Sequence, residues 1–92
     1  MKLKDIIFTD GKLRRAERQG DSFLLEFVDF NNSPVTINFS GVSESKVHSE
    51  ALVLSIQDYV VSKIETGKKL SLLDDNNHEL LTVIFSDSEV QK

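Results

Sequence analysis

One short pattern occurs twice in this chain, and it restricts the possible fold more than any other feature of the sequence. Residues 22–40 and residues 69–86 each contain an alternation of apolar and polar side chains, an Asn-Asn turn and a second alternation that ends in Phe-Ser. A period of two residues is that of a half-buried β-strand, and Asn tolerates the left-handed backbone of a tight turn. We therefore predict two similar β-hairpins that contribute to one core.

The spacing between the two copies changes within the pattern. Leu25 and Leu70 are 45 positions apart, whereas Phe39 and Phe85 are 46 positions apart. We therefore predict one extra residue in the second turn.

The second strand of each hairpin supplies the predicted core. Side chains that alternate with polar neighbours point to one face of a strand. We expect six of them to share a core: Val35, Ile37, Phe39, Leu81, Val83 and Phe85.

Length and composition predict one small folded domain over residues 1–92. The hydrophobic fraction of 39%, with six Phe, is typical of a globular domain rather than a disordered chain. The chain has no cysteine, which excludes disulfides and thiolate metal sites. It also has no apolar run long enough for a secretory signal or a transmembrane helix. We expect a soluble cytoplasmic protein.

The remaining segments predict a mainly β fold, either an antiparallel β-sandwich or an open barrel of about six to eight strands. Residues 50–65 leave an alternative open, because their apolar side chains match both a two-residue and a helical period. Val60 and Val61 favour a strand, with a kink near Gln57 and Asp58. A helix at this place would instead give an α+β fold with a single helix.

Basic residues are concentrated near the N-terminus, although the whole chain has a net charge of −4. Residues 1–18 carry +3 and the remainder carries −7. A basic strand could meet an acidic partner, or its charges could be neutralised by neighbouring acidic strands. The mostly polar segment 12–19 has the composition of an edge strand. The net negative charge disfavours a nucleic-acid partner.

An edge strand offers unpaired backbone groups to a protein partner or to a second copy of the chain. Alternation places Lys12, Arg14 and Arg18 on one face of this strand. Leu13 and Arg15 should then lie on the other face. The predicted partner contact combines the basic face with an exposed aromatic residue at the end of the first hairpin: Lys12, Arg14, Arg18 and Phe30.

No cluster of residues has the spacing of a catalytic or metal site. His48 and His78 are the two histidines of the chain, and neither has a second His or Cys at ligand spacing. The two Asx-rich turns begin like calcium loops, but they lack Gly at the sixth position and Glu at the twelfth. We therefore predict no catalytic residue, no cofactor and no metal ligand, and a protein that is not an enzyme.

Five generic strand-and-turn segments are spread over most of the chain, at residues 10–13, 23–27, 39–42, 56–59 and 80–86. Their order resembles a group of small bacterial all-β domains that includes candidate toxin-immunity proteins and many uncharacterised ones. The resemblance implies an all-β fold, no catalysis and a protein partner. It assigns no site residue.

Two functions follow from the sequence. The first is a non-enzymatic protein-interaction module of the immunity or adaptor type, without affinity for nucleic acid or membranes. The alternative is a ligand- or metal-binding domain that uses loop carboxylates, namely Asp29, Asp74, Asp75 and Glu79.

Overall fold

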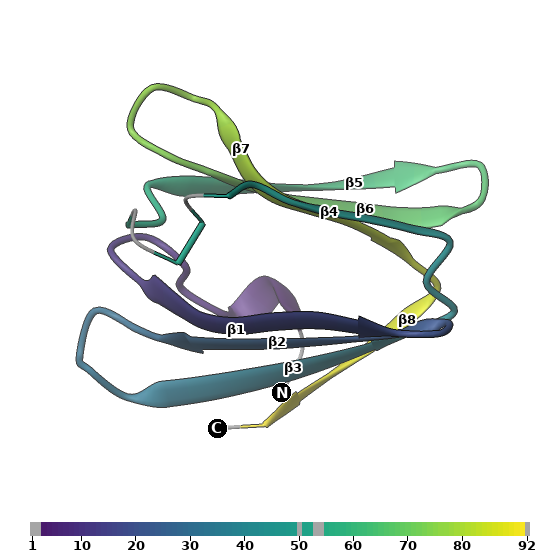
Figure 1. The fold of residues 1–92 in the computed structure, drawn as a ribbon, viewed down its shortest axis with the longest axis horizontal. Helices are drawn as coiled ribbons and strands as arrows, with labels where there is room; N and C mark the ends of the chain where they lie inside the picture. The colour runs from purple at the N-terminus through teal and green to yellow at the C-terminus, as the bar shows by residue number, and fades with distance from the viewer. Residues whose placement is uncertain (1–2, 50, 53–54, 92) are drawn as a thin grey trace.

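The structure, a computed structural model, describes residues 3–49, 51–52 and 55–91. In chain order these residues form the 3-10 helix η1 (Leu3–Asp5) and the strands β1 (Lys12–Gln19), β2 (Ser22–Val28), β3 (Pro34–Ser40), β4 (Glu44–Val47), β5 (Asp58–Ile64), β6 (Gly67–Leu73), β7 (Glu79–Phe85) and β8 (Asp87–Gln91). Two antiparallel sheets, with the orders β1-β2-β3-β8 and β4-β7-β6-β5, lie face to face as a sandwich (Figure 1). This confirms the predicted antiparallel sandwich of six to eight strands.

The two repeated segments form the central hairpins of the two sheets, β2–β3 and β6–β7. All six side chains predicted for the shared core are buried. The rings of Phe39 and Phe85, one from each hairpin, meet between the sheets with their centroids 4.6 Å apart. The prediction of one core built by two hairpins is confirmed.

An aspartate organises the turn of each central hairpin in the same way. Oδ1 of Asp29 accepts hydrogen bonds of 2.9 Å from the backbone N–H groups of Asn31 and Ser33. Asp74 accepts two bonds of the same length from the N–H groups two and four positions after it. The turns are therefore equal in length, and the prediction of an extra residue in the second turn is wrong.

The extra residue is a β-bulge in β7. Leu72 pairs with Leu81, but Leu73 pairs with Glu79, so Leu80 has no partner on β6. Leu80 is buried, and its carbonyl oxygen accepts a 2.8 Å hydrogen bond from the backbone N–H of His48. The buried bulge at Leu80 thus accounts for the change from 45 to 46 positions in the spacing between the two copies of the pattern.

The structural repeat extends beyond the hairpins to the flanking strands. Arg15 of β1 lies opposite Glu26 of β2, and Val60 and Ser71, each 45 positions later, lie opposite each other in β5 and β6. The chain thus consists of two halves with the same order of four strands.

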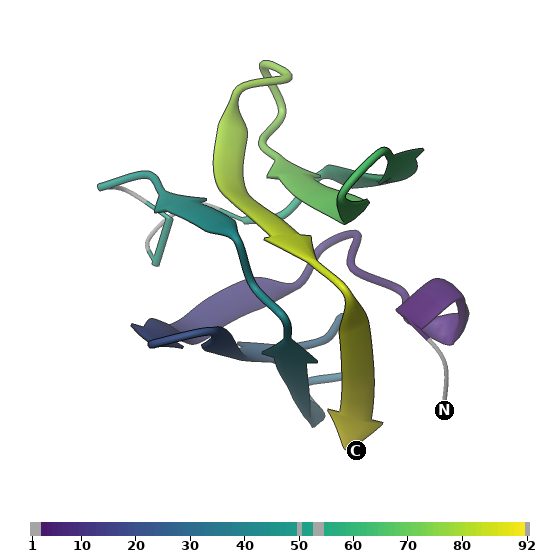
Figure 2. The ribbon, with the colours of Figure 1, turned by 90° about the vertical axis from the view of Figure 1, so that its right-hand side faces the viewer.

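Each half gives its last strand to the sheet of the other half. β3 continues through Gly41 into β4, which pairs with β7, and β7 continues through Ser86 into β8, which pairs with β3. Figure 2 shows the second of these connections as the yellow chain that passes from one sheet to the other. Gly41 has a φ of 63°, in the left-handed region that glycine adopts without strain, at the bend between β3 and β4.

Segment 50–65, whose apolar pattern matched both a strand and a helix, contains the strand β5. Its described residues contain no helix. Ser55 forms a single bridge with Lys12 of the other sheet, and from Asp58 onward the chain pairs with β6. The change of partner falls at the predicted kink. Residues 50, 53 and 54 of the predicted segment lie outside the described residues.

Two strands differ from the sequence-based expectation. The polar segment of β4 was not predicted as a strand, because its order comes from pairing with β7 rather than from its own alternation. The polar C-terminal segment forms β8, which pairs with β3 of the first sheet, so that Val90 lies opposite Ile37.

The N-terminal segment covers one side of the core between the sheets. Leu3, Ile6 and Phe8 are buried there, and η1 packs against β8. The Phe8 ring lies 5.0 Å from that of Phe27 and 4.9 Å from that of Tyr59, measured between centroids. Phe8 therefore connects the start of the chain to both sheets.

Candidate functional site

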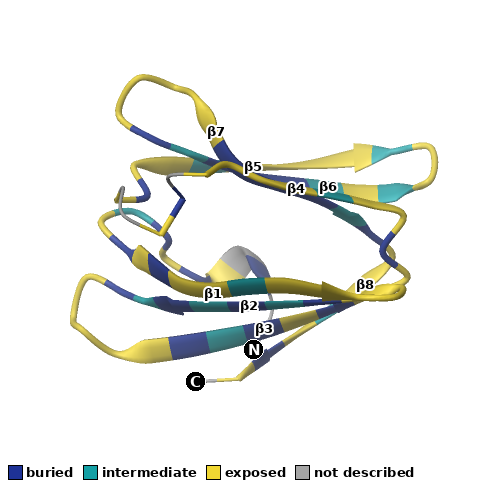
Figure 3. Cartoon of the chain, viewed as in Figure 1, coloured by how far each residue is buried: buried dark blue, intermediate teal, exposed yellow. Residues whose placement is uncertain are grey.

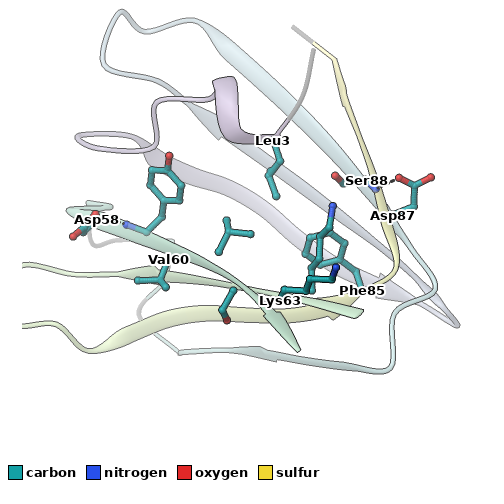
Figure 4. A pocket seen from close by; sticks show the side chains of 11 residues that line it. Leu3, Asp58, Val60, Lys63, Phe85, Asp87 and Ser88 are labelled. Carbon is teal, nitrogen blue, oxygen red and sulfur yellow. Dashed lines mark hydrogen bonds between the residues drawn. The ribbon is translucent and has the colours of Figure 1, made fainter. Parts of the chain in front are cut away.

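A groove of about 1070 Å³ runs beside the edge strand β5 (Figure 4). It lies between β5, η1 and β8, with the side chains of Leu3 and Phe85 among its apolar lining. The remaining lining consists of residues 58–63 of β5, Lys68 of β6, and Asp87 and Ser88 of β8. The groove therefore adjoins an exposed strand edge along most of its length.

The charged side chains of the groove are separated along β5. Lys63 lies directly opposite Lys68, whereas Asp58 begins the strand at its other end. Figure 4 shows Lys63 extending toward Phe85, and Asp87 on the facing wall with its carboxylate turned away from the centre of the groove. The lysine end of β5 thus presents a positive charge to the groove.

The edge strand β5 is exposed and apolar at its centre. Val60 and Val61 are 49% and 41% exposed, and Figure 3 shows most of β5 as exposed. Tyr59, next to them, is partly buried against Phe8. The strand is thus held at its beginning and presents its middle to solvent.

The predicted edge strand at residues 12–19 is β1, an edge of the other sheet, but a bulge changes its two faces. Leu13 pairs with Phe27 and Arg15 with Glu26, so Arg14 is the bulged residue. Because a bulge inserts one residue, it reverses the alternation of the residues that follow it. The predicted division of the faces is therefore wrong.

Paired residues in a sheet share a face, which assigns the side chains of β1. Arg18 pairs with the buried Phe23, so it lies on the inner face with Leu13. Arg15 lies on the outer face with Lys12. The three basic residues predicted to share one face therefore do not share it.

Two of the arginines make contacts within the fold. Arg18 donates hydrogen bonds to the carbonyl oxygens of Gly20 at 2.9 Å and Val42 at 3.2 Å. Arg15 forms an ion pair of 2.9 Å with Glu17, whose pKa is lowered by the hydrogen bond and charge of this arginine. The same contact raises the pKa of Arg15. The ion pair between Arg15 and Glu17 therefore neutralises part of the positive charge of segment 12–19 within the fold.

The other predicted contact residues lie toward one end of the sheet. Lys12 pairs with Val28, and Phe30 follows two positions later, 53% exposed in the β2–β3 turn. Arg18 lies near the opposite end of β1, beside the β1–β2 turn. Among the described residues, neither Lys12 nor Arg14 forms an ion pair.

A polar hollow of about 220 Å³ at the β6–β7 turn brings the two histidines together. It is lined by residues from that turn and from the chain after β4: His48, Asp74, Asp75, Asn76, His78, Glu79 and Leu80. Spacing in the sequence did not indicate this meeting, because it depends on the pairing of β4 with β7. Asp29, the fourth predicted carboxylate, lies in the turn of the other sheet and does not line the hollow.

Asp74 is the most constrained side chain of the hollow. Its pKa is lowered, chiefly by the hydrogen bond from the backbone N–H of His78 and also by that of Asn76. Its Oδ2 lies 3.8 Å from Nδ1 of His78. Within the part of the chain that the structure describes, no three His, Asp or Glu side chains are grouped to hold a metal ion.

Comparison with protein-family models found no match for the chain, and comparison with curated proteins found none either. Among the described residues, no helix has the length and apolar character needed to span a bilayer. The fold and the geometry of its surface therefore carry the functional argument.

Proposed function

We propose that this chain is a non-enzymatic protein-interaction module of the immunity or adaptor type, which contacts its partner through an edge of the sandwich. The supporting observation is that both sheets end in long exposed strands, β1 and β5, of seven or eight residues. Such edges offer backbone hydrogen-bonding groups for strand addition, on β1 beyond the bridge between Lys12 and Ser55. The resemblance to small bacterial all-β domains and the cytoplasmic location stay predictions from the sequence.

The partner contact proposed for β1 uses the end of the sheet where Lys12, Arg14 and Phe30 are exposed. The charges there favour an acidic protein surface. Arg18 is a poor residue for testing this contact, because it holds the carbonyl oxygen of Val42 within the fold. Arg14 is the better choice, since it is exposed and sits at the bulge.

Affinity capture from native cells tests this function. The tagged parent should recover an acidic protein that Arg14→Glu recovers at least about fivefold less well, because a reversed charge repels an acidic surface. Lys46→Glu makes the same change on β4 of the other sheet and should behave like the parent. If no recovered protein discriminates between the two variants, the proposed contact through β1 is wrong.

The second candidate function is ligand binding at the polar hollow, favoured by the convergence of His48, His78 and three carboxylates there. A ligand of the native state raises the melting temperature by mass action. Millimolar calcium or magnesium should leave the melting temperature unchanged if the interaction-module proposal is right. A shift that Glu79→Gln removes would favour the ligand-binding function instead.

A further inference from the structure

The two halves of the sandwich place equivalent strands at their edges, but these strands differ in how they resist pairing with another chain. Arg15 and Glu17 of β1 occupy the positions that Val60 and Ser62 occupy in β5. β1 also has a bulge at Arg14, whereas the pairing of β5 with β6 is regular throughout. Charges and bulges are the features by which natural edge strands limit indiscriminate pairing, so β1 can accept only a partner that matches its charges. The centre of β5 has neither.

The exposed centre of β5 is also suited to a sheet. Val60 and Val61 are β-branched and almost half exposed, and they adjoin a groove that is apolar at Leu3 and Phe85. In the order of its sheet, β5 is the last strand, so among the described residues no strand lies beside the edge that faces away from β6. Both the backbone and the side chains of this edge thus fit a further strand.

The charges of β5 select the partner strand. The strand begins at Asp58 and has Lys63 near its end, opposite Lys68 of β6. An antiparallel strand of the same sequence brings its own aspartate to the lysine end and its own lysine to the aspartate end. A parallel copy would place like charges side by side. Asp58 and Lys63 lie on opposite faces of β5, because they are five positions apart in a regular strand. Opposite charges of the two copies thus approach each other only across the sheet, and the antiparallel direction is favoured because it keeps like charges apart.

We propose that β5 pairs with β5 of a second copy of this chain, antiparallel and about a two-fold axis at Val60 or Val61. A two-fold axis perpendicular to the sheet places one residue opposite itself, because paired residues must share a face. With either centre, Asp58 of the second copy lies opposite a neighbour of Lys63. The pairing extends the sheet across the groove, and it leaves β1 of the other sheet available for the proposed partner.

The inner face of the added strand enters the groove. Val61 lies opposite Leu70, a core residue, so it points to the inner face together with Tyr59. The same residues of the second copy would therefore face the apolar lining at Leu3 and Phe85. Val61 and the groove are then covered by one contact, and Val60 on the outer face gains a neighbouring strand.

Sedimentation velocity over a range of concentrations tests the pairing. The parent should form a dimer of twice the 10.4 kDa chain mass. Val61→Arg should raise the dissociation constant at least about tenfold, because it places a charge at or directly beside the two-fold axis. Val47→Arg is the matched control, since Val47 is also 41% exposed and lies on β4, the opposite edge of the same sheet. A parent that stays monomeric up to about 1 mM, or equal effects of both variants, would overturn the proposal.

Disulfide trapping gives a second test that does not depend on how Val61→Arg folds. The chain has no cysteine, so a single introduced cysteine can form a disulfide only between copies. The residue at the axis has its Cα about 4.5–5.5 Å from its own copy, within the range for a disulfide. One of Val60→Cys and Val61→Cys should therefore cross-link under mild oxidation, and Val47→Cys should not. If neither cross-links, or Val47→Cys does so equally, the pairing through β5 is wrong.

Discussion

At the scale of single residues, the two turn aspartates show how one side chain fixes a local structure. Asp29 and Asp74 each accept two backbone hydrogen bonds through Oδ1, and each turn has an Asn with a φ close to 60°, Asn32 and Asn77. Asp-based turns satisfy N–H groups that the ladder leaves unpaired, and Asn tolerates the left-handed region. The same residues thus produce the same turn in two different sheets.

Asp74→Asn should destabilise the protein at about pH 7, and this loss should shrink at about pH 3. The folded state lowers the pKa of Asp74, so the stabilisation by its carboxylate is present above the unfolded pKa of about 4. It is lost as the pH falls through the lower folded pKa. Urea unfolding of parent and variant at both pH values measures the difference.

Asp74→Ala supplies the control for this titration. It removes the acceptor as well as the charge, so it should cost more than Asp74→Asn at both pH values, because the Asn Oδ1 can still accept both bonds. An Asn variant whose loss is the same at both pH values would show that the charge of Asp74 does not stabilise the fold.

The rings at the centre of the sandwich lead to a second prediction at this scale. Phe39→Ala and Phe85→Ala should each cost roughly 3–5 kcal/mol of unfolding free energy, through lost burial and a cavity. Phe30→Ala, at an exposed turn, should change it by less than about 0.5 kcal/mol. Chemical denaturation measures all three, and losses below about 1 kcal/mol at both core positions would contradict their packing between the sheets.

At the scale of elements, the main feature is the bend that carries a strand from one sheet to the other. β3 passes into β4 at Gly41, where the backbone has a positive φ and lies against Ser86 of the other crossing strand. The backbone N–H of Ser86 donates a 3.0 Å hydrogen bond to the carbonyl oxygen of Ser40. The two crossing strands thus meet at the corner of the sandwich.

Gly41→Ala should destabilise the protein more than Gly20→Ala. Both glycines have a positive φ, 63° and 62°, so an added side chain is strained at both by about 1–2 kcal/mol. A Cβ at Gly41 would also lie 2.5 Å from Oγ of Ser86, whereas a Cβ at Gly20 would have no neighbour within 4 Å.

Thermal unfolding measures the difference between the two glycine variants. Ser86→Gly should restore part of the stability that Gly41→Ala loses, because it removes the side chain that collides with the added Cβ. Equal losses of stability in both variants would mean that the backbone at Gly41 and Ser86 accommodates the added Cβ without a further loss of stability.

At the scale of the whole molecule, the exchange of terminal strands makes the halves dependent on each other. β4 has its only strand neighbour, β7, in the second half, and β8 has its only strand neighbour, β3, in the first half, among the described residues. Phe39 and Phe85 then join the two halves across the core. The repeat therefore builds one cooperative unit rather than two.

A fragment of residues 1–49 should be unfolded on its own, because it lacks both β8 and the opposing sheet that covers its apolar face. Mixing it with a fragment of residues 50–92 should restore the β-sheet circular dichroism of the intact chain. A fragment of residues 1–49 that unfolds cooperatively by itself would contradict this dependence of the halves.

The hairpins, the positions of their turns and the core could be predicted because their signals lie within short segments, whereas the length of the second turn could not. The alternation of Val35, Ile37 and Phe39, for example, requires no knowledge of the rest of the chain. The edge position of β1 and the exposure of Phe30 were likewise visible, since polar and turn residues mark both. Local periodicity thus determined which residues of the two central hairpins form strands and which of their faces are buried.

What the tertiary structure alone decided is how those strands meet. The bulge at Arg14 reversed the face of Arg18, the pairing of β4 with β7 joined His48 to His78, and the opening beside β5 formed where η1 and β8 approach it. Each of these depends on pairing or packing between different segments, and the last two bring together segments far apart in the chain. A shift of one residue in the register between strands moves every side chain of a strand to the other face, and the alternation within a single strand does not fix it.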